Sequence, residues 1–293
     1  MQQQILIIGC GDIGKRVARL WLERGSDVSV LTRNVQQFDQ HDHIQVNTVE
    51  GNLDQLETLA GMPARNACIY YFVPPPDDGD DDPRMRAFIY QLRNGELPEK
   101  IIYISTTGVY GDCNGAWVTE QSTVNPQNQR SKRRLAAEKL LTNWHAATRV
   151  PVVILRVAGI YGPGRLPIGR IKTGQPVLNE QEAPFSNRIH SDDLARICVA
   201  AAVQIVNGYH IYNVSDGHPT TMTDYYNRVA KTAGLPPPRI ISLSETATEF
   251  SPMMLSFLSE SKRVDNRKML QELGVELLYP DLESGLRHTQ KDK

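Results

Sequence analysis

A glycine-rich segment near the beginning of the chain has the residue types and spacing that bind a phosphate-bearing ligand. The segment reads G-x-G-x-x-G and comprises Gly9, Gly11 and Gly14, with Asp12 and Ile13 before the last glycine. In this pattern the first glycine permits a tight turn, the second admits a diphosphate, and the third lets a helix pack against a strand. The N–H groups at the start of that helix favour an anion. We therefore predict that these five residues bind the diphosphate of a dinucleotide, and a glycine turn without a ligand is the alternative.

The end of the next apolar run indicates which dinucleotide is bound. An enzyme that uses NAD usually carries an acid about 20 residues after the glycines, where it accepts hydrogen bonds from the ribose 2′-OH. This chain has Thr32 and Arg33 there, followed by Asn34. An arginine attracts a 2′-phosphate through charge-assisted hydrogen bonds. We therefore predict NADP as cofactor, with NAD as the alternative, and assign Thr32, Arg33 and Asn52 to its site. The competing interpretation of Arg33 is a solvated charge at a strand end.

Strands and helices must position these groups, and the hydrophobic pattern indicates how. Apolar runs at 5–8 and 28–31 enclose a segment with apolar residues at helical spacing, which makes one βαβ unit. Further strands are expected at 44–49, 67–73, 101–105, 151–156 and 209–214. Strands that are apolar throughout and alternate with helices are typical of a parallel sheet covered on both faces. The prediction is an α/β protein with a doubly wound parallel Rossmann sheet.

The alternation of strands and helices breaks down after about residue 215, which indicates a smaller C-terminal substrate lobe. We expect residues 1–158 plus 187–214 to form an NAD(P)-binding Rossmann domain, and residues 159–186 plus 215–293 to form the substrate-binding lobe. The acidic run at 77–82 is expected to be a loop, because like charges repel along a regular element. A solvated surface loop is its plain interpretation, and a metal or substrate role is the alternative.

Composition excludes several classes of protein. The chain has 293 residues, 40% of them hydrophobic, and a net charge of −1, so no general attraction to nucleic acid or to an anionic membrane is expected. The four cysteines contain no C-x-x-C pair, which argues against a metal site and against a disulfide framework. The sequence shows neither a secretory signal nor an apolar run of membrane-spanning length. We expect a cytoplasmic protein with free thiols and no metal, whose partner is a small-molecule substrate.

Four further segments carry a resemblance to a known family. They are YISTTGVYG at 103–111, LRVAGIYGPG at 155–164, NRIHSDDLA at 187–195 and YNV at 212–214. Together with the glycine segment they resemble the extended short-chain dehydrogenase/reductases, the NAD-dependent epimerase/dehydratase family, and are nearest an atypical bacterial branch whose substrates are generally unassigned. The resemblance implies a cofactor domain, a substrate lobe and hydride transfer at C4 of the nicotinamide. It also implies a homodimer formed through helices around 84–94 and 130–148.

The resemblance assigns catalytic and substrate positions. The family's Ser/Thr falls at Thr106, with Thr107 beside it, and a hydroxyl there orients a substrate oxygen. A threonine that caps a turn is the alternative. From their own chemistry, Tyr161, Arg188 and His190 are predicted to lie in the substrate site, with Arg188 as a group that can grip an anion. Tyr161, His190 and Tyr110 are also possible acids or bases, although none of them stands at the family's dyad positions. The alternative for Tyr161 and His190 is packing, with His190 at a helix start. The arginine that many sugar-nucleotide members have four residues before His190 is Ser186 here.

The family's Tyr-x-x-x-Lys dyad is missing. If Glu138 marks the acid that follows the lysine, the lysine position is Arg134 and the tyrosine position is Arg130. Another alignment puts the tyrosine at Asn128. A guanidinium stays protonated and cannot replace the phenol in acid/base work. Arg134 can still hold the nicotinamide ribose, and a solvated basic helix face over 130–134 is the competing interpretation.

Two hypotheses follow. The first is an NADP-dependent oxidoreductase or epimerase that acts on a small polar substrate, with Thr106 orienting it. The second is an NADP(H)-binding sensor or regulatory protein that has kept the fold and lost the dyad, because Arg130 stands where the phenol should be.

Overall fold

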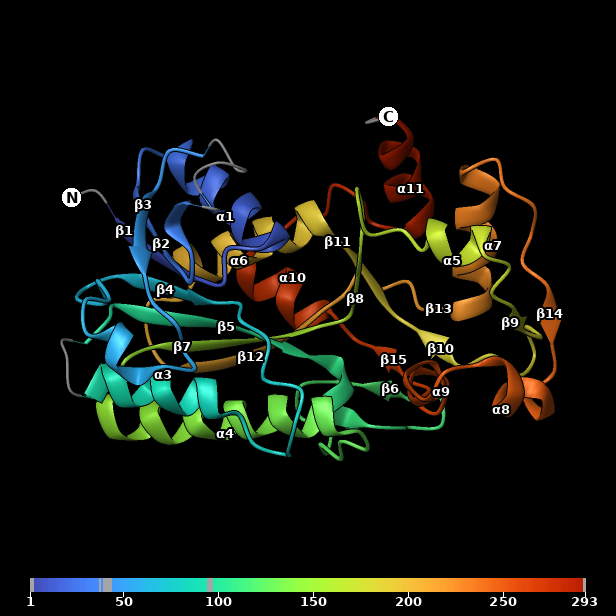
Figure 1. Cartoon of the computed structure of the whole chain (residues 1–293), viewed down its shortest axis with the longest axis horizontal. Coiled ribbons are helices and arrows are strands. Elements are labelled where there is room, and N and C mark those ends of the chain that lie inside the picture. Colours follow the sequence, from blue (N-terminus) through green and yellow to red (C-terminus); the bar gives the residue numbers. More distant parts are fainter. Residues whose placement is uncertain (1–2, 37, 39–43, 94–96, 292–293) are drawn as a thin grey trace.

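Seven parallel strands form one continuous sheet in the larger part of the molecule (Figure 1). The computed structural model describes residues 3–36, 38, 44–93 and 97–291, so residues 1–2, 37, 39–43, 94–96 and 292–293 of the predicted domains lie outside the described part. The strand order is β12-β7-β5-β4-β1-β2-β3. The strands are β1 (Gln4–Ile8), β2 (Asp27–Thr32), β3 (Asn47–Glu50), β4 (Cys68–Tyr71), β5 (Lys100–Thr106), β7 (Val152–Val157) and β12 (Tyr209–Val214). The predicted doubly wound fold is confirmed.

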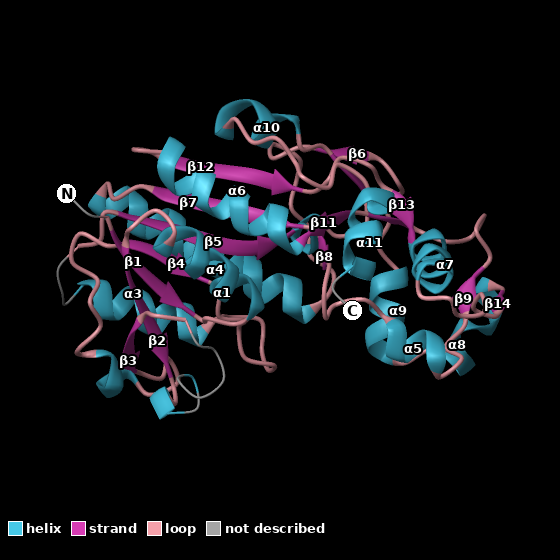
Figure 2. Ribbon diagram, turned by 90° about the horizontal axis from the view of Figure 1, so that it is seen from above, coloured by secondary structure: helices cyan, strands magenta, loops and turns pink. Residues whose placement is uncertain are grey.

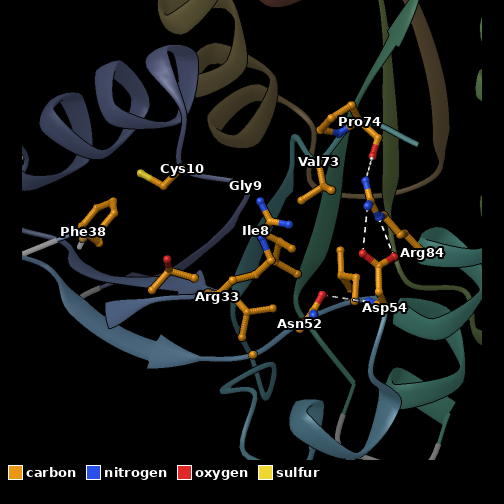
Figure 3. A pocket seen from close by; sticks show the side chains of 14 residues that line it. Ile8, Gly9, Cys10, Arg33, Phe38, Asn52, Asp54, Val73, Pro74 and Arg84 are labelled. Carbon is orange, nitrogen blue, oxygen red and sulfur yellow. Dashed lines mark hydrogen bonds and ion pairs between the residues drawn. The ribbon is translucent and has the colours of Figure 1, made fainter. Parts of the chain in front are cut away.

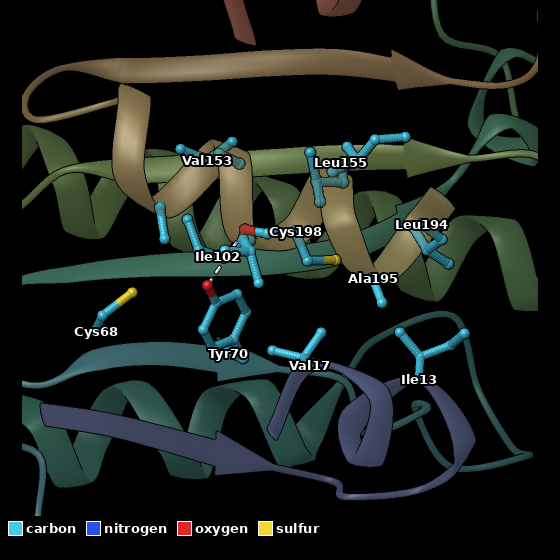
Figure 4. Packing of buried hydrophobic residues seen from close by; sticks show 14 of the residues in the cluster. Ile13, Val17, Cys68, Tyr70, Ile102, Val153, Leu155, Leu194, Ala195 and Cys198 are labelled. Carbon is cyan, nitrogen blue, oxygen red and sulfur yellow. Dashed lines mark hydrogen bonds between the residues drawn. The ribbon is translucent and has the colours of Figure 1, made fainter. Parts of the chain in front are cut away.

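Helices cover both faces of this sheet because its strands are apolar on both faces. On β1, Ile5 and Ile7 pack into one hydrophobic core, whereas Leu6 and Ile8 pack into another. The first core includes residues of α1 (Asp12–Leu22) and α6 (Ser191–Gln204), and the second includes residues of α3 (Pro83–Arg93) and α4 (Gln129–Thr148). Figure 1 shows the two pairs of helices on opposite faces of the sheet, and Figure 2 shows the strands of the sheet from above. Figure 4 shows the packing between α1, the sheet and α6, where the Tyr70 hydroxyl donates to the Cys198 carbonyl at 3.2 Å.

The predicted strand positions agree with the observed ones to within one residue, except at β3 and at the end of β4, which stops at Tyr71 rather than at residue 73. The run at 44–49 predicted its start at Ile44, but the strand begins at Asn47. Residues 44–46 are apolar or amide residues outside the ladder, and Ile44 and Val46 instead pack against the core beneath α1. Hydrophobicity alone does not show at which residue a strand begins to pair with the neighbouring strand.

A second lobe lies beyond the carboxyl edge of the sheet, on the right in Figure 1. Its elements are β8 (Gly159–Tyr161), α5 (Ile168–Lys172), β9 (Val177–Leu178), β10 (Phe185–Ser186), β11 (Arg188–His190), β13 (Thr220–Thr221), α7 (Met222–Thr232), β14 (Ile240–Ile241), η3 (Leu243–Glu245), α8 (Thr246–Glu249), α9 (Pro252–Leu258) and α11 (Leu282–Lys291). Tyr161, Tyr225, Val229 and Leu286 belong to its own hydrophobic core.

One C-terminal helix departs from the predicted division of the chain. Residues 215–293 were assigned to the substrate lobe, but α10 (Arg267–Leu273) packs on α6 and β12. Met269 and Leu273 are buried in the same core as β1. The helix returns to the sheet because the adjacent strand β15 (Arg263–Val264) pairs with β6 (Trp117–Val118). The remaining elements are the 3-10 helices η1 (Leu56–Leu59) and η2 (Thr107–Tyr110).

Candidate functional site

The glycine loop between β1 and α1 has the geometry of a diphosphate cradle. Gly9 has φ +92°, and a Cβ there would lie 2.8 Å from the backbone nitrogen of Val73. At Gly14 a Cβ would lie 3.0 Å from the carbonyl oxygen of Gly9, so the glycine lets α1 approach β1. At Gly11 a Cβ would meet nothing within 4 Å, so the space above this residue is open. No side chain caps the start of α1 at Gly11, which leaves first-turn N–H groups directed at that space. The loop therefore fits a dinucleotide diphosphate.

A cavity of about 240 Å³ continues from this loop along the carboxyl ends of β1, β2 and β3 (Figure 3). Four of the predicted cofactor residues line it, namely Gly9, Thr32, Arg33 and Asn52. The others, Gly11, Asp12, Ile13 and Gly14, lie in the loop and the first turn of α1. The side chain of Ile13 is buried in the core, so only its backbone is available to a ligand. The size and position of the cavity suit the adenosine half of a dinucleotide.

Two residues of this cavity that the sequence analysis missed form an ion pair. Arg84 donates to both oxygens of Asp54 at 2.7 and 2.8 Å, and its remaining nitrogen donates to the Pro74 carbonyl at 3.0 Å (Figure 3). The hydrogen bond from Arg84 lowers the pKa of Asp54, and the charge of Arg33 acts in the same direction. Asp54 is therefore ionised but already occupied by a bidentate partner. Asp54 follows β3 and Arg84 lies in the first turn of α3. Both are far from the glycine loop in the sequence, so no local pattern could have revealed them.

Thr106 and Thr107 lie where β5 ends. Thr106 is the N-cap of η2, and its hydroxyl oxygen accepts a hydrogen bond from the Gly108 amide at 3.1 Å. This is the capping role that the alternative interpretation predicted, and the hydroxyl hydrogen remains able to donate. Thr107 is buried. Thr106 is thus the one of the pair with a half-exposed side chain at this edge.

Arg134 occupies the carboxyl edge between β4 and β5. Its Nη1 donates to the Ile104 carbonyl at 2.9 Å, with the Tyr103 hydroxyl at 3.3 Å and the Val73 carbonyl at 3.4 Å. Val73 also contacts the glycine loop, so the guanidinium lies next to the predicted path of the cofactor. The competing prediction of a solvated basic face is wrong for Arg134, which is partly buried, and for Arg133, which is 5% exposed. Arg130 is exposed at the first turn of α4, within electrostatic reach of Glu260.

The acidic run docks on the basic helix α4. Arg133 donates to the Gly79 carbonyl at 2.7 Å, and Lys132 pairs with Asp80 at 3.4 Å. Residues 77–81 are exposed, as the prediction of a solvated loop requires. Asp82 is different, because it is fully buried and accepts from the Met85 amide at 3.0 Å at the start of α3. Burial raises the pKa of this carboxyl.

A buried polar network lies behind these residues. Glu138 of α4 accepts from the Ser105 hydroxyl at 2.6 Å and from Arg156 of β7 at 2.7 Å. The Arg156 guanidinium also donates to the Tyr110 hydroxyl at 3.0 Å, which in turn donates to Asn213 at 2.7 Å. The Glu138 and Arg156 side chains are 4% and 5% exposed. The network therefore ties α4 to β5, β7 and β12, and so positions Arg134 and Thr106.

The structure places Tyr161 and His190 in packing positions. His190 is the N-cap of α6, where its Nδ1 accepts from the Asp192 amide at 3.2 Å, and its ring lies 4.0 Å from that of Tyr279. Burial lowers the pKa of His190 to about 4, against the opposing charges of the neighbouring carboxylates, so the imidazole is neutral at pH 7. Tyr161 is fully buried, and its hydroxyl donates to the Asp281 carbonyl at 3.1 Å. Both side chains match the packing alternative.

Arg188 lies at the junction of the two lobes without an ion-pair partner among the described residues. Its guanidinium lies 4.2 Å from the centre of the Tyr225 ring, and it occupies the space that a Cβ on Gly159 would need. Burial lowers the pKa of Arg188, although tyrosines and Asp216 oppose the shift. Burial also raises the pKa of Asp216 to about 7, and one of its oxygens has no partner in the described structure. Asp216 was not singled out from the sequence, because an acid in a turn has no distinctive spacing.

The described residues hold no group of three or more His, Cys, Asp or Glu side chains placed to bind a metal ion. No helix in the described part of the chain has the length and apolar character needed to cross a membrane.

Comparisons with known proteins show which families and folds the chain is similar to. The model of the NAD dependent epimerase/dehydratase family matches residues 85–215, and that of the TrkA-N domain matches residues 5–97. The chain is 31% identical over 183 residues to Protein YeeZ of Escherichia coli K12, an alignment that covers 62% of this chain and 59% of the length of YeeZ.

Two solved structures match over nearly the whole chain. A functionally unknown conserved protein from Silicibacter pomeroyi has a TM-score of 0.83 and 30% identity, with 99% of each chain covered. UDP-glucose 4-epimerase from Bifidobacterium longum, solved with NAD+ and UDP, has a TM-score of 0.78 and 19% identity over 99% of this chain and 98% of its own, which shows a shared fold.

Proposed function

The chain belongs to the NAD-dependent epimerase/dehydratase family, and we propose that it is a nicotinamide-dependent oxidoreductase or epimerase acting on a small polar substrate. The observation that carries this proposal is the glycine loop, which is open above Gly11 and continues into a cavity lined by Thr32, Arg33 and Asn52. The loop N–H groups would hold the diphosphate and the cavity the adenosine. When bound, the nicotinamide would supply hydride transfer at its C4.

NADP is the proposed cofactor, and the charged groups that line the cavity support this choice. The cavity contains two guanidinium groups, Arg33 and Arg84, and one carboxylate, Asp54. Because Arg84 already engages both oxygens of Asp54, this acid is poorly placed to accept hydrogen bonds from a ribose 2′-OH. Arg33 is exposed at the rim and remains available to a 2′-phosphate.

Arg33→Asp tests this preference. Replacing the guanidinium with a carboxylate should weaken NADPH binding at least tenfold and tighten NADH binding, because the charge at the 2′ position is reversed. Isothermal titration calorimetry with each cofactor measures both changes. Arg24→Asp, an arginine that lies on Trp21 away from the cavity, is the matched control. Unchanged affinities for both cofactors in Arg33→Asp would remove Arg33 from the site.

The catalytic part of the proposal rests on Thr106 and Arg134. The Thr106 hydroxyl can donate to a substrate oxygen, because its own oxygen accepts from the Gly108 amide. Arg134 uses Nη1 on backbone carbonyls, which leaves other donors for the hydroxyls of the nicotinamide ribose. Arg188 is the proposed anchor for an anionic part of the substrate, since its buried charge lacks a carboxylate partner among the described residues.

Single-turnover measurements test the enzymatic proposal. Purified protein loaded with NADPH is mixed with a panel of carbonyl compounds and keto-sugars, and loss of absorbance at the nicotinamide band is followed. Turnover that falls about a hundredfold in Thr106→Val, with cofactor affinity retained, would support the role of Thr106. Turnover that is the same in Thr106→Val and the unaltered protein would overturn it.

The second candidate is a NADP(H)-binding sensor or regulator. The observation that favours it is the pair of guanidinium groups, Arg130 and Arg134, at the two dyad positions of α4, since neither takes part in proton transfer near pH 7. Tight NADPH binding without turnover across the panel would favour this candidate over the first.

Location and assembly belong to the same proposal. The four cysteines are free, which supports a reducing cytoplasmic environment. Helices α3 and α4 lie side by side, and this supports their use as the contact surface of a homodimer.

A further inference from the structure

Asp12 places a negative charge beside the proposed diphosphate site. It is the first residue of α1, directly after the open position at Gly11. Helix N-termini favour anions, but a carboxylate close to a bound diphosphate repels it unless the charge is offset. A fingerprint that contains an acid at this position therefore needs a cation nearby.

Two arginines supply that cation, and they come from different lobes. Arg16, one turn further along α1, donates to Asp12 at 2.8 Å. Arg165 donates to the other oxygen of Asp12 from the segment between β8 and α5. Burial raises the pKa of Asp12, but the hydrogen bonds from Arg165 and Arg16 outweigh this and hold it below its usual value. Asp12 is thus a carboxylate shared by two guanidinium groups.

The two arginines differ in what else they contact. Arg16 also pairs with Asp192 at the start of α6, so its charge is divided between two acids. Arg165 has its ion pair with Asp12 and with no second acid of the described chain. The Arg165 and Asp12 side chains are 34% and 35% exposed, so solvent and a ligand can reach them. Arg165 therefore has guanidinium N–H groups that can donate to a ligand at the opening of the glycine loop.

The segment that carries Arg165 belongs to the second lobe and contains two glycines with positive φ. Gly162 and Gly164 have φ +138° and +74°, and Leu166 beyond them packs against the core of that lobe. A Cβ on Gly164 would meet nothing within 4 Å, whereas a Cβ on Gly162 would collide with the Ser191 Oγ, so the segment is open beside Arg165 and closely packed at its start. A ligand that binds Arg165 therefore also contacts the 162–167 segment of the second lobe.

We propose that Arg165 is a clamp on the cofactor diphosphate, contributed by the substrate lobe. Its guanidinium donates to the diphosphate oxygens while it offsets the charge of Asp12, so cofactor binding adds a further attachment of the 162–167 segment to the start of α1. The inference rests on the proposed function, because it requires a dinucleotide at the glycine loop. The alternative is that Arg165 and Asp12 form a salt bridge that only joins the lobes.

Opposite effects of two substitutions separate these explanations. A salt bridge between lobes is broken equally by Arg165→Gln and Asp12→Asn, so both would change NADPH affinity in the same direction or not at all. For a clamp, Arg165→Gln raises the Kd for NADPH about tenfold, because charge-assisted hydrogen bonds are lost. Asp12→Asn lowers the Kd a few fold, because the diphosphate then faces one carboxylate fewer.

Calorimetric titration of the full-length variants with NADPH and with ADP-ribose measures these effects. ADP-ribose has the diphosphate but no nicotinamide, so Arg165→Gln should weaken both ligands by the same factor. Arg170→Gln is the matched control, since it removes an exposed arginine of α5 and should leave both affinities within about twofold. Arg165→Lys retains the charge and should lie between Arg165→Gln and the unaltered protein. Melting temperatures of the ligand-free variants establish that they fold.

The outcomes are distinguishable. If the unaltered protein binds NADPH and Arg165→Gln binds it equally well, the clamp is wrong and the proposed function stands. Effects of the same sign in Arg165→Gln and Asp12→Asn, or an effect on NADPH without one on ADP-ribose, also overturn the clamp. If the unaltered protein binds neither NADPH nor NADH, both the proposed function and the clamp are wrong.

Discussion

The two halves of the carboxyl edge of the sheet are built in different ways. At β1 and β2 the structure of the edge is determined by residues close together in the sequence, because Gly9, Gly11 and Gly14 shape both the turn and the start of α1. The half at β5 and β7 depends on partners far apart in the sequence, such as Glu138 with Arg156 and Tyr110 with Asn213. A short motif suffices for the first half, whereas the second exists only when strands and helices have assembled.

This difference also explains how the chain departs from its family. The cofactor half retains the glycine pattern intact. In the half at β5 and β7, Arg134 stands at the proposed lysine position. It donates to the carbonyls of Val73, after β4, and of Ile104 in β5, and the buried Glu138 and Arg156 pair keeps α4 in position. The buried pair therefore positions α4, and with it the residues at the two proposed dyad positions. Substitutions in each half should therefore have separable effects.

The largest expected effect is loss of stability in Glu138→Ala. Removing this carboxylate leaves the buried Arg156 without its counter-ion, and breaking one partner of a buried pair costs about 3–5 kcal/mol. Urea denaturation measures the free energy of unfolding. The control is Glu283→Ala, whose ion pair with Arg287 is 66% and 70% exposed, and which should change stability by less than about 1 kcal/mol. A loss in Glu138→Ala no larger than in the control would mean that the network does not stabilise the half of the edge at β5 and β7.

The next effect separates two glycines of the cofactor half. Gly9→Ala puts a Cβ 2.8 Å from the Val73 nitrogen at φ +92°, so it should cost about 1–3 kcal/mol of stability as well as NADPH binding. Gly11→Ala meets no protein atom within 4 Å and should leave the melting temperature unchanged, while its methyl group intrudes on the diphosphate and weakens NADPH binding about a hundredfold. Thermal melts and calorimetry test both variants. If Gly11→Ala keeps full affinity, the space above Gly11 does not hold the ligand.

The smallest effect concerns the pH dependence of stability at the junction of the lobes. Because burial raises the pKa of Asp216 to about 7, the folded protein holds a proton there that the unfolded chain, with its ordinary value of 3.8, has released. Stability should therefore fall as the pH rises between these two values. Asp216→Asn removes this dependence, so relative to the unaltered protein it should gain up to about 2 kcal/mol between about pH 5.5 and pH 7.

Urea denaturation at several pH values tests this expectation, with Glu283→Gln as the exposed control. A difference between Asp216→Asn and the unaltered protein that stays constant over this range would show that Asp216 is ionised in the folded state. The junction of the lobes would then lack a proton-bearing carboxyl near Arg188.

By itself, the amino-acid sequence determined the parallel sheet and the dinucleotide-type loop. Apolar runs such as 5–8 specify strands buried on both faces, and glycine spacing specifies a turn, since both depend on neighbours along the chain. It did not reveal that Arg84 forms an ion pair with Asp54, that the acidic run packs on α4, or that α10 packs against the core of the sheet.

Only the tertiary structure decided which charges are paired and which are not. Arg133 and Arg134 look like a solvated basic face in the sequence, yet folding buries them against the carbonyls of Gly79 and Ile104. His190 has the chemistry of an acid or base, but burial keeps it neutral as a helix cap. The reason is physical: local pattern controls backbone conformation, whereas the state of an ionisable side chain depends on the solvent and partners that distant segments remove or supply.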